Sequence, residues 1–380
     1  MIEPASHLAL RQSITERILA DRTLLDQLRA EVRILANRVR RIQPRNGTSI
    51  SLVAADGGDT RLQYDPFLIQ LVRVVDSGSN EYCLEAITPS TSIPDLSRRQ
   101  FDGAGRPVTA LGRLMAFLGI EQLNQLGRFM EVDASGAATL ASWIREYREM
   151  VEWAILFSLI RDRTFATDTL IVVDGLLRSP VFADDLFRRI MEGIEKAIKD
   201  QYQATRRRLY LVGIAKHSKV LDRYRLAMAL ENVLTNRYPA YVDVPPDMER
   251  SAYSRQEYVL REGTSAGDEQ INRFVGGKMH FVKFGSHAAD PIWPVDIFLP
   301  QRQDAAAILG YLLTDAANGF PVPFYPLCLQ KAHEYAALVD FDFDVLQDQV
   351  LDGIRTLLGP EAAALDGLQL QTLDPAQNRY

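Results

Sequence analysis

Two short apolar segments, far apart in the chain, each lead to an aspartate that is followed by glycine. One segment covers residues 50–55 and leads to Asp56, and the other covers residues 169–173 and leads to Asp174. Such runs are typical of buried strands. A carboxylate at a strand end, with a flexible glycine just beyond it, faces a cleft and not the core. The sequence therefore predicts an α/β fold in which two strands present two aspartates.

The two aspartates could share one site if their strands are neighbours in a single sheet. Two carboxylates with further oxygen ligands form a site for Mg²⁺ or Mn²⁺. Metals held in this way commonly catalyse the cleavage or transfer of phosphodiesters. Asp-Gly after a strand is also an ordinary turn sequence, so a purely structural role for both residues is the alternative.

Composition narrows the class of protein. With 380 residues, 47% hydrophobic and 24% charged, the chain is typical of a soluble globular protein with one large domain or two. Its net charge of −6 gives no overall attraction to nucleic acid, so contact with DNA would require local basic patches, such as the arginines at 38–41 or 206–208. The two cysteines exclude a disulfide framework and fit a reducing cytoplasm. We expect no signal peptide and no transmembrane helix.

Apolar residues recur at helical spacing over residues 8–42, which predicts one long N-terminal helix. Such an amphipathic helix usually packs on its own domain or on a second subunit. Strands are expected over residues 49–56, 67–75, 81–87, 169–174, 209–215, 279–284 and 295–299. Helices are expected over residues 109–117, 120–129, 139–162, 181–203, 303–317, 326–338 and 345–358, with a loop at 89–106.

The order of these elements is three antiparallel strands, then helices, then strand–helix–strand. This order is that of a ribonuclease H-like mixed sheet flanked by helices, although other α/β folds share it. We expect three parts: an N-terminal helical arm (1–45), a ribonuclease H-like domain (46–345) with an insertion at about 226–300, and a C-terminal helix and tail (346–380).

Four short motifs together resemble the NurA nucleases, which are partners of the HerA ATPase in DNA-end processing. In this sequence they are Ala55-Asp56-Gly57, Leu170-Ile171-Val172-Val173-Asp174-Gly175, Val212-Gly213-Ile214-Ala215-Lys216, and Tyr325-Pro326-Leu327 with Ala332-His333. They occur in the family's order and span most of the chain. The chain departs from the family at Gly58, where a serine is usual, and this removes a hydroxyl but leaves the carboxylate of Asp56.

The resemblance implies a Mn²⁺- or Mg²⁺-dependent deoxyribonuclease, acting as an exonuclease and single-strand endonuclease. It also implies a homodimer that docks on a HerA-like hexameric ATPase in DNA-end resection and repair. Asp56 would be the first metal ligand and Asp174 the second, and the family uses a helical glutamate between them. On the helix at 144–159, Glu152 lies nearest the apolar face, Glu149 lies farther round and Glu146 lies nearly opposite. We therefore assign Glu152 as the ligand, with Glu149 in reserve.

Three further residues have roles that the resemblance implies. His333 would bind metal or transfer a proton to the leaving group. Tyr325 would orient a phosphate or water, and Lys216, at a strand end, would neutralise the scissile phosphate. Without the resemblance, the ordinary interpretations are a structural histidine, an aromatic anchor beneath the helix and a surface lysine. The glutamates would likewise be solvated helix residues.

Two other functions fit parts of the sequence. The segment Asp56-Gly57-Gly58-Asp59-Thr60 looks like the first phosphate loop of the actin and sugar-kinase superfamily, which would make the protein a phosphotransferase. No second phosphate loop, glycine-rich adenosine motif or Walker-type loop accompanies it. The long helices could instead belong to a non-catalytic scaffold subunit, whose function would survive replacement of Asp56 or Asp174.

Overall fold

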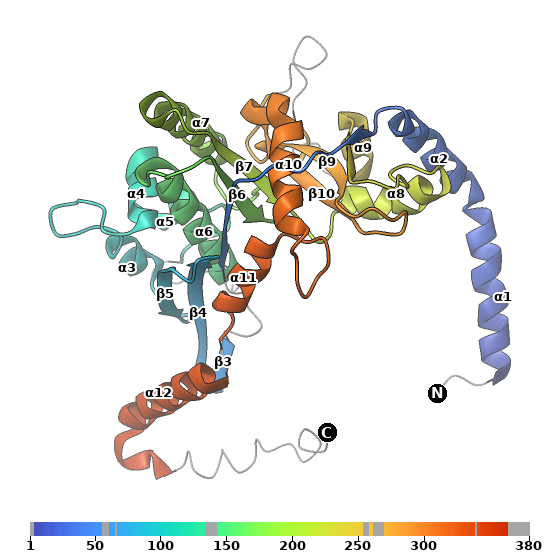
Figure 1. Ribbon diagram of the computed structural model, residues 1–380. Coiled ribbons are helices and arrows are strands. Elements are labelled where there is room, and N and C mark those ends of the chain that lie inside the picture. The colour runs from blue at the N-terminus through green and yellow to red at the C-terminus, as the bar shows by residue number, and fades with distance from the viewer. Residues whose placement is uncertain are drawn as a thin grey trace.

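The computed structural model describes residues 4–54, 61–64, 67–133, 143–253, 258–260, 270–338 and 340–363. Ten strands form one mixed sheet, and helices cover both of its faces (Figure 1). The strands are β1 (Arg40–Arg41), β2 (Thr48–Ala54), β3 (Arg61–Tyr64), β4 (Phe67–Asp76), β5 (Glu81–Ile87), β6 (Thr169–Asp174), β7 (Leu209–Ile214), β8 (Ala240–Asp243), β9 (Gly277–Lys283) and β10 (Ile292–Phe298). The predicted α/β class is thus confirmed.

The α-helices precede the first strand, lie between later strands and follow the last strand along the chain. They are α1 (Pro4–Ala20), α2 (Arg22–Ala36), α3 (Ile93–Arg98), α4 (Ala110–Leu118), α5 (Leu123–Leu126), α6 (Trp143–Asp162), α7 (Leu186–Thr205), α8 (Lys219–Leu230), α9 (Pro246–Ala252), α10 (Ala305–Ala316), α11 (Leu327–Ala336) and α12 (Asp340–Leu358). Among the described helices, none has both the length and the apolar character needed to span a bilayer.

Parallel and antiparallel pairing divide the sheet into regions. The strand order is β1-β8-β9-β10-β7-β6-β2-β4-β3, and β5 also pairs with β4. At the centre, β6 runs parallel to both β2 and β7. On one side β4 is antiparallel to β2, β3 and β5, and on the other β10 is antiparallel to β7 and β9. The carboxyl ends of β2, β6 and β7 therefore lie at the same edge of the sheet.

The central strands are buried on both faces, because their side chains alternate between two apolar clusters. Ile171 and Leu211 pack with α4, α6 and α7 on one face. Val172 and Val212 pack with α10 and α11 on the other face. Figure 1 shows α10 and α11 crossing in front of the sheet, and α4, α6 and α7 on its left. A third cluster joins α2, α8 and α9 to β8 and β9.

The N-terminal region is not one helix, and this corrects the prediction for residues 8–42. A turn at Asp21 separates α1 from α2, and α2 ends at Ala36. The arginines at 40 and 41 lie in β1, paired with β8, and not in the last turns of a helix. Val32 and Leu35 of α2 are fully buried against α8, whereas α1 extends from the body (Figure 1).

Three local differences have a physical cause. The predicted loop at 89–106 contains α3, which begins because the Ser92 hydroxyl accepts a hydrogen bond from the Asp95 N–H at 3.3 Å. The predicted helix at 120–129 shrinks to α5, because Gly127 is extended and pairs with Phe182. Helix α8 is absent from the predicted helices, and it begins at a similar cap, where the Ser218 hydroxyl accepts a hydrogen bond from the Val220 N–H.

Candidate active site

The strands that lead to the two aspartates are neighbours, which meets the condition for both residues to share one site. The parallel register pairs Leu52 of β2 with Val173 of β6, so both strands end at the same edge. Asp174 is the last residue of β6. Asp56 lies outside the described residues, and its predicted role as a metal ligand stays a prediction.

Two residues from the region of α11 converge on Asp174. The hydroxyl of Tyr325, just before α11, donates to Oδ1 of Asp174 at 3.0 Å. Nε2 of His333, within α11, lies 2.9 Å from Oδ2 of the same carboxylate. The structure therefore brings three predicted site residues into contact, although Asp174 and Tyr325 are 151 positions apart in the chain.

The contact between His333 and Asp174 is suited to a shared cation. Nε2 of His333 is buried, and it has no well-aligned hydrogen-bond partner among the described residues despite its closeness to Oδ2. A buried polar atom without a partner is costly and calls for an explanation. Imidazole nitrogen and carboxylate oxygen are both ligands of divalent transition metals. No group of three or more metal-binding side chains occurs within the described part of the chain, so the pair needs further ligands.

Asp174 is held in its ionised form. Burial raises its pKa, but His333, Lys216 and Tyr325 together outweigh burial and leave the pKa below the ordinary value of 3.8. Burial and the nearby Asp174 carboxylate raise the pKa of Tyr325, so its hydroxyl stays protonated and donates. The carboxylate is thus ionised at neutral pH, as metal binding requires.

Lys216 follows β7 at the same edge and is exposed. Its Nζ lies 5.5 Å from the centre of the Tyr325 ring. Its positive charge is close enough to lower the pKa of Asp174. The predicted strand-end lysine is therefore beside the aspartate, on the side of the sheet that α11 covers.

On the other side of Asp174, a cavity of about 250 Å³ separates this aspartate from α6. Both candidate glutamates, Glu149 and Glu152, line the cavity, as do Arg145 and Arg148. Glu149 accepts a hydrogen bond from the Ser179 hydroxyl at 2.6 Å, and burial raises its pKa. Glu152 is partly exposed. The structure thus places both glutamates near Asp174, and Glu149 is already bonded to Ser179.

Glu146 differs from its expected place nearly opposite the apolar face of the helix. It is only 9% exposed, because α6 is buried on almost every side. Burial first, and then the charge of Glu149, raise the pKa of Glu146 to about 7. The helical periodicity of the sequence missed this residue, since it assumed one apolar face and one solvated face.

The loop after β6 is fixed by a buried ion-pair network. Arg178 donates from Nε and Nη2 to the two carboxylate oxygens of Asp296 at 2.8 and 3.1 Å, and from Nη1 to the carbonyl of Tyr258 at 2.6 Å. Its Nη1 also lies 2.7 Å from Oε2 of Glu249. Both carboxylates are almost fully buried. No local sequence signal points to this network, because Arg178 and Asp296 are 118 positions apart in the chain.

Glycines let this loop pass close to neighbouring strands. A Cβ added at Gly213 would lie 2.5 Å from the carbonyl oxygen of Gly175, so only glycine fits beneath the loop. The N–H of Gly175 donates to the carbonyl of Ile214 at 2.8 Å, and the N–H of Gly276 donates to the carbonyl of Leu177 at 2.8 Å. The loop is therefore held by β7 and by the segment before β9.

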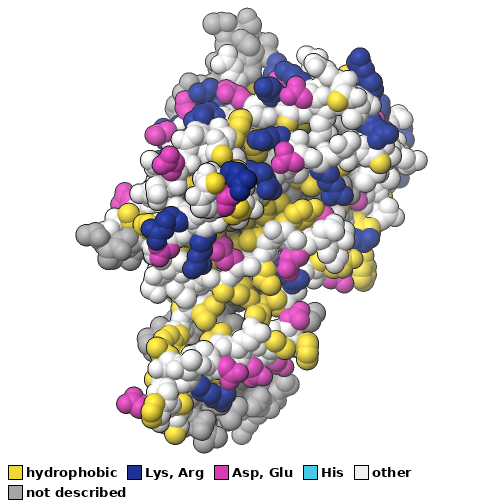
Figure 2. Space-filling view, turned by 90° about the vertical axis from the view of Figure 1, so that its left-hand side faces the viewer, with side chains coloured by type: hydrophobic (Ala, Val, Ile, Leu, Met, Phe, Trp, Pro, Cys, Tyr) yellow, Lys and Arg dark blue, Asp and Glu magenta, His cyan; other side chains and the backbone are white. Residues whose placement is uncertain are grey.

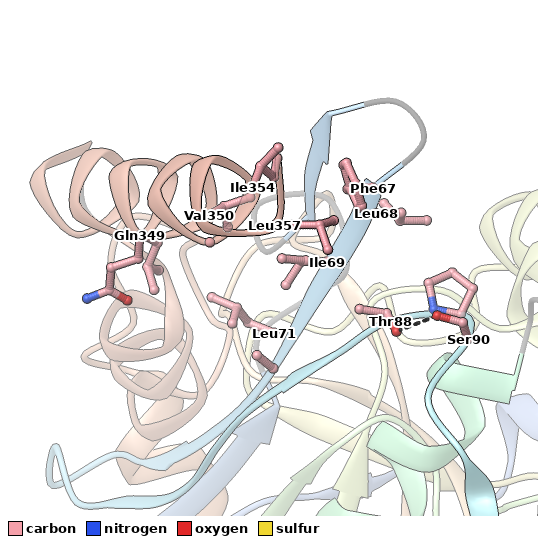
Figure 3. Close-up of a pocket in the computed structure, with 14 residues that line it drawn as sticks. Phe67, Leu68, Ile69, Leu71, Thr88, Ser90, Gln349, Val350, Ile354 and Leu357 are labelled. Carbon is pink, nitrogen blue, oxygen red and sulfur yellow. Dashed lines mark hydrogen bonds between the residues drawn. The ribbon is translucent and has the colours of Figure 1, made fainter. Parts of the chain in front are cut away.

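A larger cavity lies elsewhere and has a different character. It measures about 570 Å³ and separates β4 from α12. Figure 3 shows Val350, Ile354 and Leu357 of α12 facing Ile69 and Leu71 of β4. Its polar side chains are those of Thr88, Ser90 and Gln349, and none of its lining residues is charged. Its described lining therefore offers no charged acid, base or metal ligand, in contrast to the lining of the cavity beside Asp174.

Comparison with known proteins gives one likeness. No protein-family model matches the chain, and no curated protein matches its sequence. Among solved structures the chain is similar to the NurA nuclease from Sulfolobus solfataricus, with 12% identity and a TM-score of 0.45, over 94% of this chain and 99% of that one. The chain thus resembles a NurA nuclease over nearly all its length. At this distance the likeness does not bear on individual residues, whose roles are inferred below from their own contacts.

Replacing Arg178 by methionine should strongly destabilise the fold. The change leaves Asp296 and Glu249 buried without their counter-charge, which costs about 3–5 kcal/mol. The matched control is Arg188→Met, because Arg188 forms its ion pairs with Asp185 and Glu192 on the exposed face of α7 and should cost less than about 1 kcal/mol. Urea denaturation measures both. Equal losses in the two variants would contradict the assigned importance of the buried network.

Glu146 should make stability fall as the pH rises through the weakly acidic range. Its folded pKa of about 7 exceeds the ordinary 4.5, so the folded state binds this proton more tightly than the unfolded state. The associated stability is complete below pH 4.5 and is lost as the pH approaches 7. The free energy of unfolding of Glu146→Gln, minus that of the wild type, should therefore increase from pH 4.5 to 7 and stay constant above pH 7. Urea denaturation across this pH range measures the free energy of unfolding of each protein, with Glu121→Gln, a change at an exposed glutamate, as the control. If the free energies of all three proteins changed with pH in parallel, the raised pKa of Glu146 would be refuted.

Proposed function

We propose that this protein is a metal-dependent DNA nuclease that acts as an exonuclease and single-strand endonuclease in DNA-end resection and repair. The observation that carries the proposal is the convergence of Tyr325 and His333 on Asp174 at the carboxyl end of β6. The adjacent parallel strand β2 leads toward Asp56. These are the residues through which the sequence resembles the NurA nucleases.

The sheet supports a ribonuclease H-like core. The segment β5-β4-β2-β6-β7 has β4 antiparallel to its two neighbours, while β6 and β7 run parallel to β2. This is the arrangement expected from three antiparallel strands followed by strand–helix–strand. Helices α6 and α11 cover opposite faces and meet the edge at Asp174. We assign the ribonuclease H-like class to this segment, with the strands β8, β9 and β10 as an addition.

Asp56, Glu152, Asp174 and His333 would hold Mn²⁺ or Mg²⁺. The buried Nε2 of His333, 2.9 Å from Oδ2 of Asp174, is an imidazole nitrogen beside a carboxylate oxygen, and this pair fits such an ion. We retain Glu152 over Glu149 because Glu149 is bonded to Ser179 and burial favours its neutral form. When bound, such an ion activates water and stabilises the leaving oxygen of a phosphodiester.

The remaining residues position the reacting groups. Tyr325 is fully buried, and its hydroxyl bond to Oδ1 fixes the orientation of the Asp174 carboxylate, leaving Oδ2 toward His333. Lys216 is exposed beside them, where its charge would stabilise the scissile phosphate. His333 has two proposed roles, metal binding and proton transfer to the leaving group. We favour metal binding, because Nε2 points to a carboxylate oxygen that would share the ion.

We further propose that the protein forms a homodimer and docks on a HerA-like hexameric ATPase. Helix α1 supports a protein contact, because Leu10, Ile14, Ile18 and Leu19 are each 47–65% exposed along it. Apolar residues repeated along one projecting helix are typical of an interaction surface. In contrast, α2 is anchored by buried residues and by ion pairs of Arg29 and Arg33 with Glu231.

Asp174→Asn should abolish degradation of end-labelled linear DNA in the presence of Mn²⁺ or Mg²⁺. The amide keeps the shape of the carboxylate but removes its charge, and we expect a loss of at least about 100-fold. Asp56→Asn should lose activity in the same way, and EDTA should abolish DNA degradation by the wild type. The control is Asp247→Asn, an exposed surface aspartate paired with Arg250, which should retain wild-type activity.

Two outcomes would overturn the proposal. One is metal-dependent cleavage in Asp174→Asn equal to that in Asp247→Asn. The other is DNA that stays intact under every condition, including with a HerA-like ATPase and ATP. In that case the phosphotransferase or scaffold alternatives gain support. Circular dichroism of each variant establishes that loss of cleavage is not loss of folding.

Light scattering coupled to gel filtration tests the proposed homodimer. The chain has a mass of 42.8 kDa, and we expect twice this value for the full-length protein. Ile14→Ser with Ile18→Ser should lower the measured mass toward that of one chain, because it removes apolar contact from α1. The matched control is Leu226→Ser, which removes an exposed apolar side chain from α8. A single-chain mass for the wild type at micromolar concentration would contradict the proposal.

A further inference from the structure

Tyr325 reaches Asp174 from a segment that lies outside the helices and strands. It follows Phe324, whose φ of 58° lies in the left-handed region, and it precedes α11. Its backbone is anchored, because its N–H donates to the carbonyl of Val322 at 3.3 Å and its carbonyl accepts from Nε2 of Gln330 at 2.9 Å. These bonds fix the main chain and leave the side-chain torsions open. The place of the hydroxyl, at the far end of the ring, therefore depends on what the ring packs against.

The indole of Trp293 packs against that ring. The two ring centres are 5.0 Å apart and the ring planes are inclined by 59°, a separation and tilt at which aromatic side chains attract each other. Tyr325 is fully buried, and Trp293 is only 9% exposed. Nζ of Lys216 lies 5.5 Å from the centre of the Tyr325 ring, within the range of a cation–π contact. The Tyr325 ring thus contacts an indole and an ammonium group, while its hydroxyl holds the Asp174 carboxylate.

Trp293 belongs to a rigid part of the sheet. It lies in β10 and pairs with Val282 of β9. The carbonyl of the next residue, Pro294, accepts a hydrogen bond from the N–H of Ala215 at 3.2 Å, which ties the same stretch to the end of β7. The residue before a proline is also restricted to extended backbone. Side chains on paired strands are held more precisely than side chains on loops, so Trp293 provides a fixed wall for the ring of Tyr325.

Packing, and not a hydrogen bond within the described residues, places this indole. Its Nε1 is buried and has no hydrogen-bond partner in that part of the chain. Buried indole N–H groups usually have a partner, and a buried donor without one is costly. The aromatic surface is therefore the part of Trp293 that contributes. Phenylalanine, which keeps an aromatic face and has no N–H, should replace Trp293 better than leucine does.

We infer that Trp293 is a positioning residue of the candidate site, because it fixes the ring of Tyr325 and, through the Tyr325 hydroxyl, the orientation of the Asp174 carboxylate. The inference deepens the proposed function and rests on the role of Asp174 as a metal ligand. If the ring tilts, Oδ1 of Asp174 loses its donor, and the carboxylate is free to rotate and to move Oδ2 away from His333. Trp293 itself takes no part in bond cleavage.

Crystal structures of the metal-free variants test the first step without metal or DNA. In the wild type and in Trp293→Phe, the Tyr325 hydroxyl should lie within hydrogen-bond distance of Oδ1 of Asp174. In Trp293→Leu, the ring should tilt and increase this distance beyond about 3.5 Å. The control is Tyr311→Leu, because Tyr311 packs on Tyr210, near the start of β7 and thus at the opposite edge of the sheet. An unbroken bond in Trp293→Leu would overturn the inference.

A double-mutant cycle on metal affinity tests whether Trp293 acts through Tyr325. Electron paramagnetic resonance of free Mn²⁺ measures binding to the folded proteins without DNA. Since outer partners of metal ligands typically affect affinity about 10- to 100-fold, Tyr325→Phe and Trp293→Leu should each weaken Mn²⁺ binding about tenfold, and Trp293→Phe less than about threefold. The two changes together should cost no more than Tyr325→Phe alone. Additive losses, or equal losses in Trp293→Phe and Trp293→Leu, would contradict the inference.

Cleavage kinetics separate failure of this inference from failure of the proposed function. With an active wild type, Trp293→Leu should lower kcat about tenfold and change KM for DNA less than about threefold, because the substrate contacts remain. Tyr311→Leu should leave both constants unchanged, with circular dichroism as the check that each variant is folded. An active wild type whose kcat survives Trp293→Leu would overturn the inference alone. A wild type that neither binds Mn²⁺ nor cleaves DNA would overturn the proposed function, and the crystal structures would still decide whether Trp293 holds Tyr325.

Discussion

The parallel pairing of β2, β6 and β7 is the constraint on which the candidate site depends. Parallel neighbours end at the same edge of a sheet, so residues that follow them in sequence meet there whatever their separation along the chain. Asp174 and Lys216 reach this edge from β6 and β7, and β2 leads there as well. Both faces of these strands are covered by apolar clusters, which makes the edge the place where polar side chains gather.

One short loop then links the two sides of the edge. Asp174 contacts residues of the α11 side, Ser179 donates to Glu149 of α6, and Arg178 is held in the buried network with Asp296. A few successive residues thus connect three regions that are distant in the chain. Because Gly213 allows the loop to lie directly on β7, the position of Asp174 depends on backbone packing as well as on its own contacts.

The sequence predicted the elements that carry local signals. The strand over 169–174 and the strand over 81–87 were located to the residue. The first is an apolar run rich in β-branched residues, and the second begins directly after a turn sequence. Asp174 was selected from its place at a strand end, and Tyr325 and His333 were selected through a family resemblance. Their mutual contact required the structure. The prediction of a single N-terminal helix was wrong, because β1 forms only through pairing with the distant strand β8. The burial of Glu146 and the Arg178 network could not be predicted from the sequence for the same reason. Each depends on tertiary contacts, which the periodicity of the sequence does not encode.

The charged residues of the chain are distributed unevenly, and those of α12 lie apart from the candidate site. On the face shown in Figure 2, the charged side chains of the lower lobe, where α12 lies, are mostly Asp and Glu, and Lys and Arg gather on the body above it. Asp342, Asp344, Asp348 and Asp352 of α12 are exposed, with Arg355 as the basic residue of its last turn. Screening at physiological salt limits each charge to a range of about 8 Å. The aspartates of that lobe therefore contribute little at the sheet edge, where basic and acidic side chains lie side by side around Asp174. Local charge, and not the net charge of −6, therefore sets the electrostatic environment of Asp174.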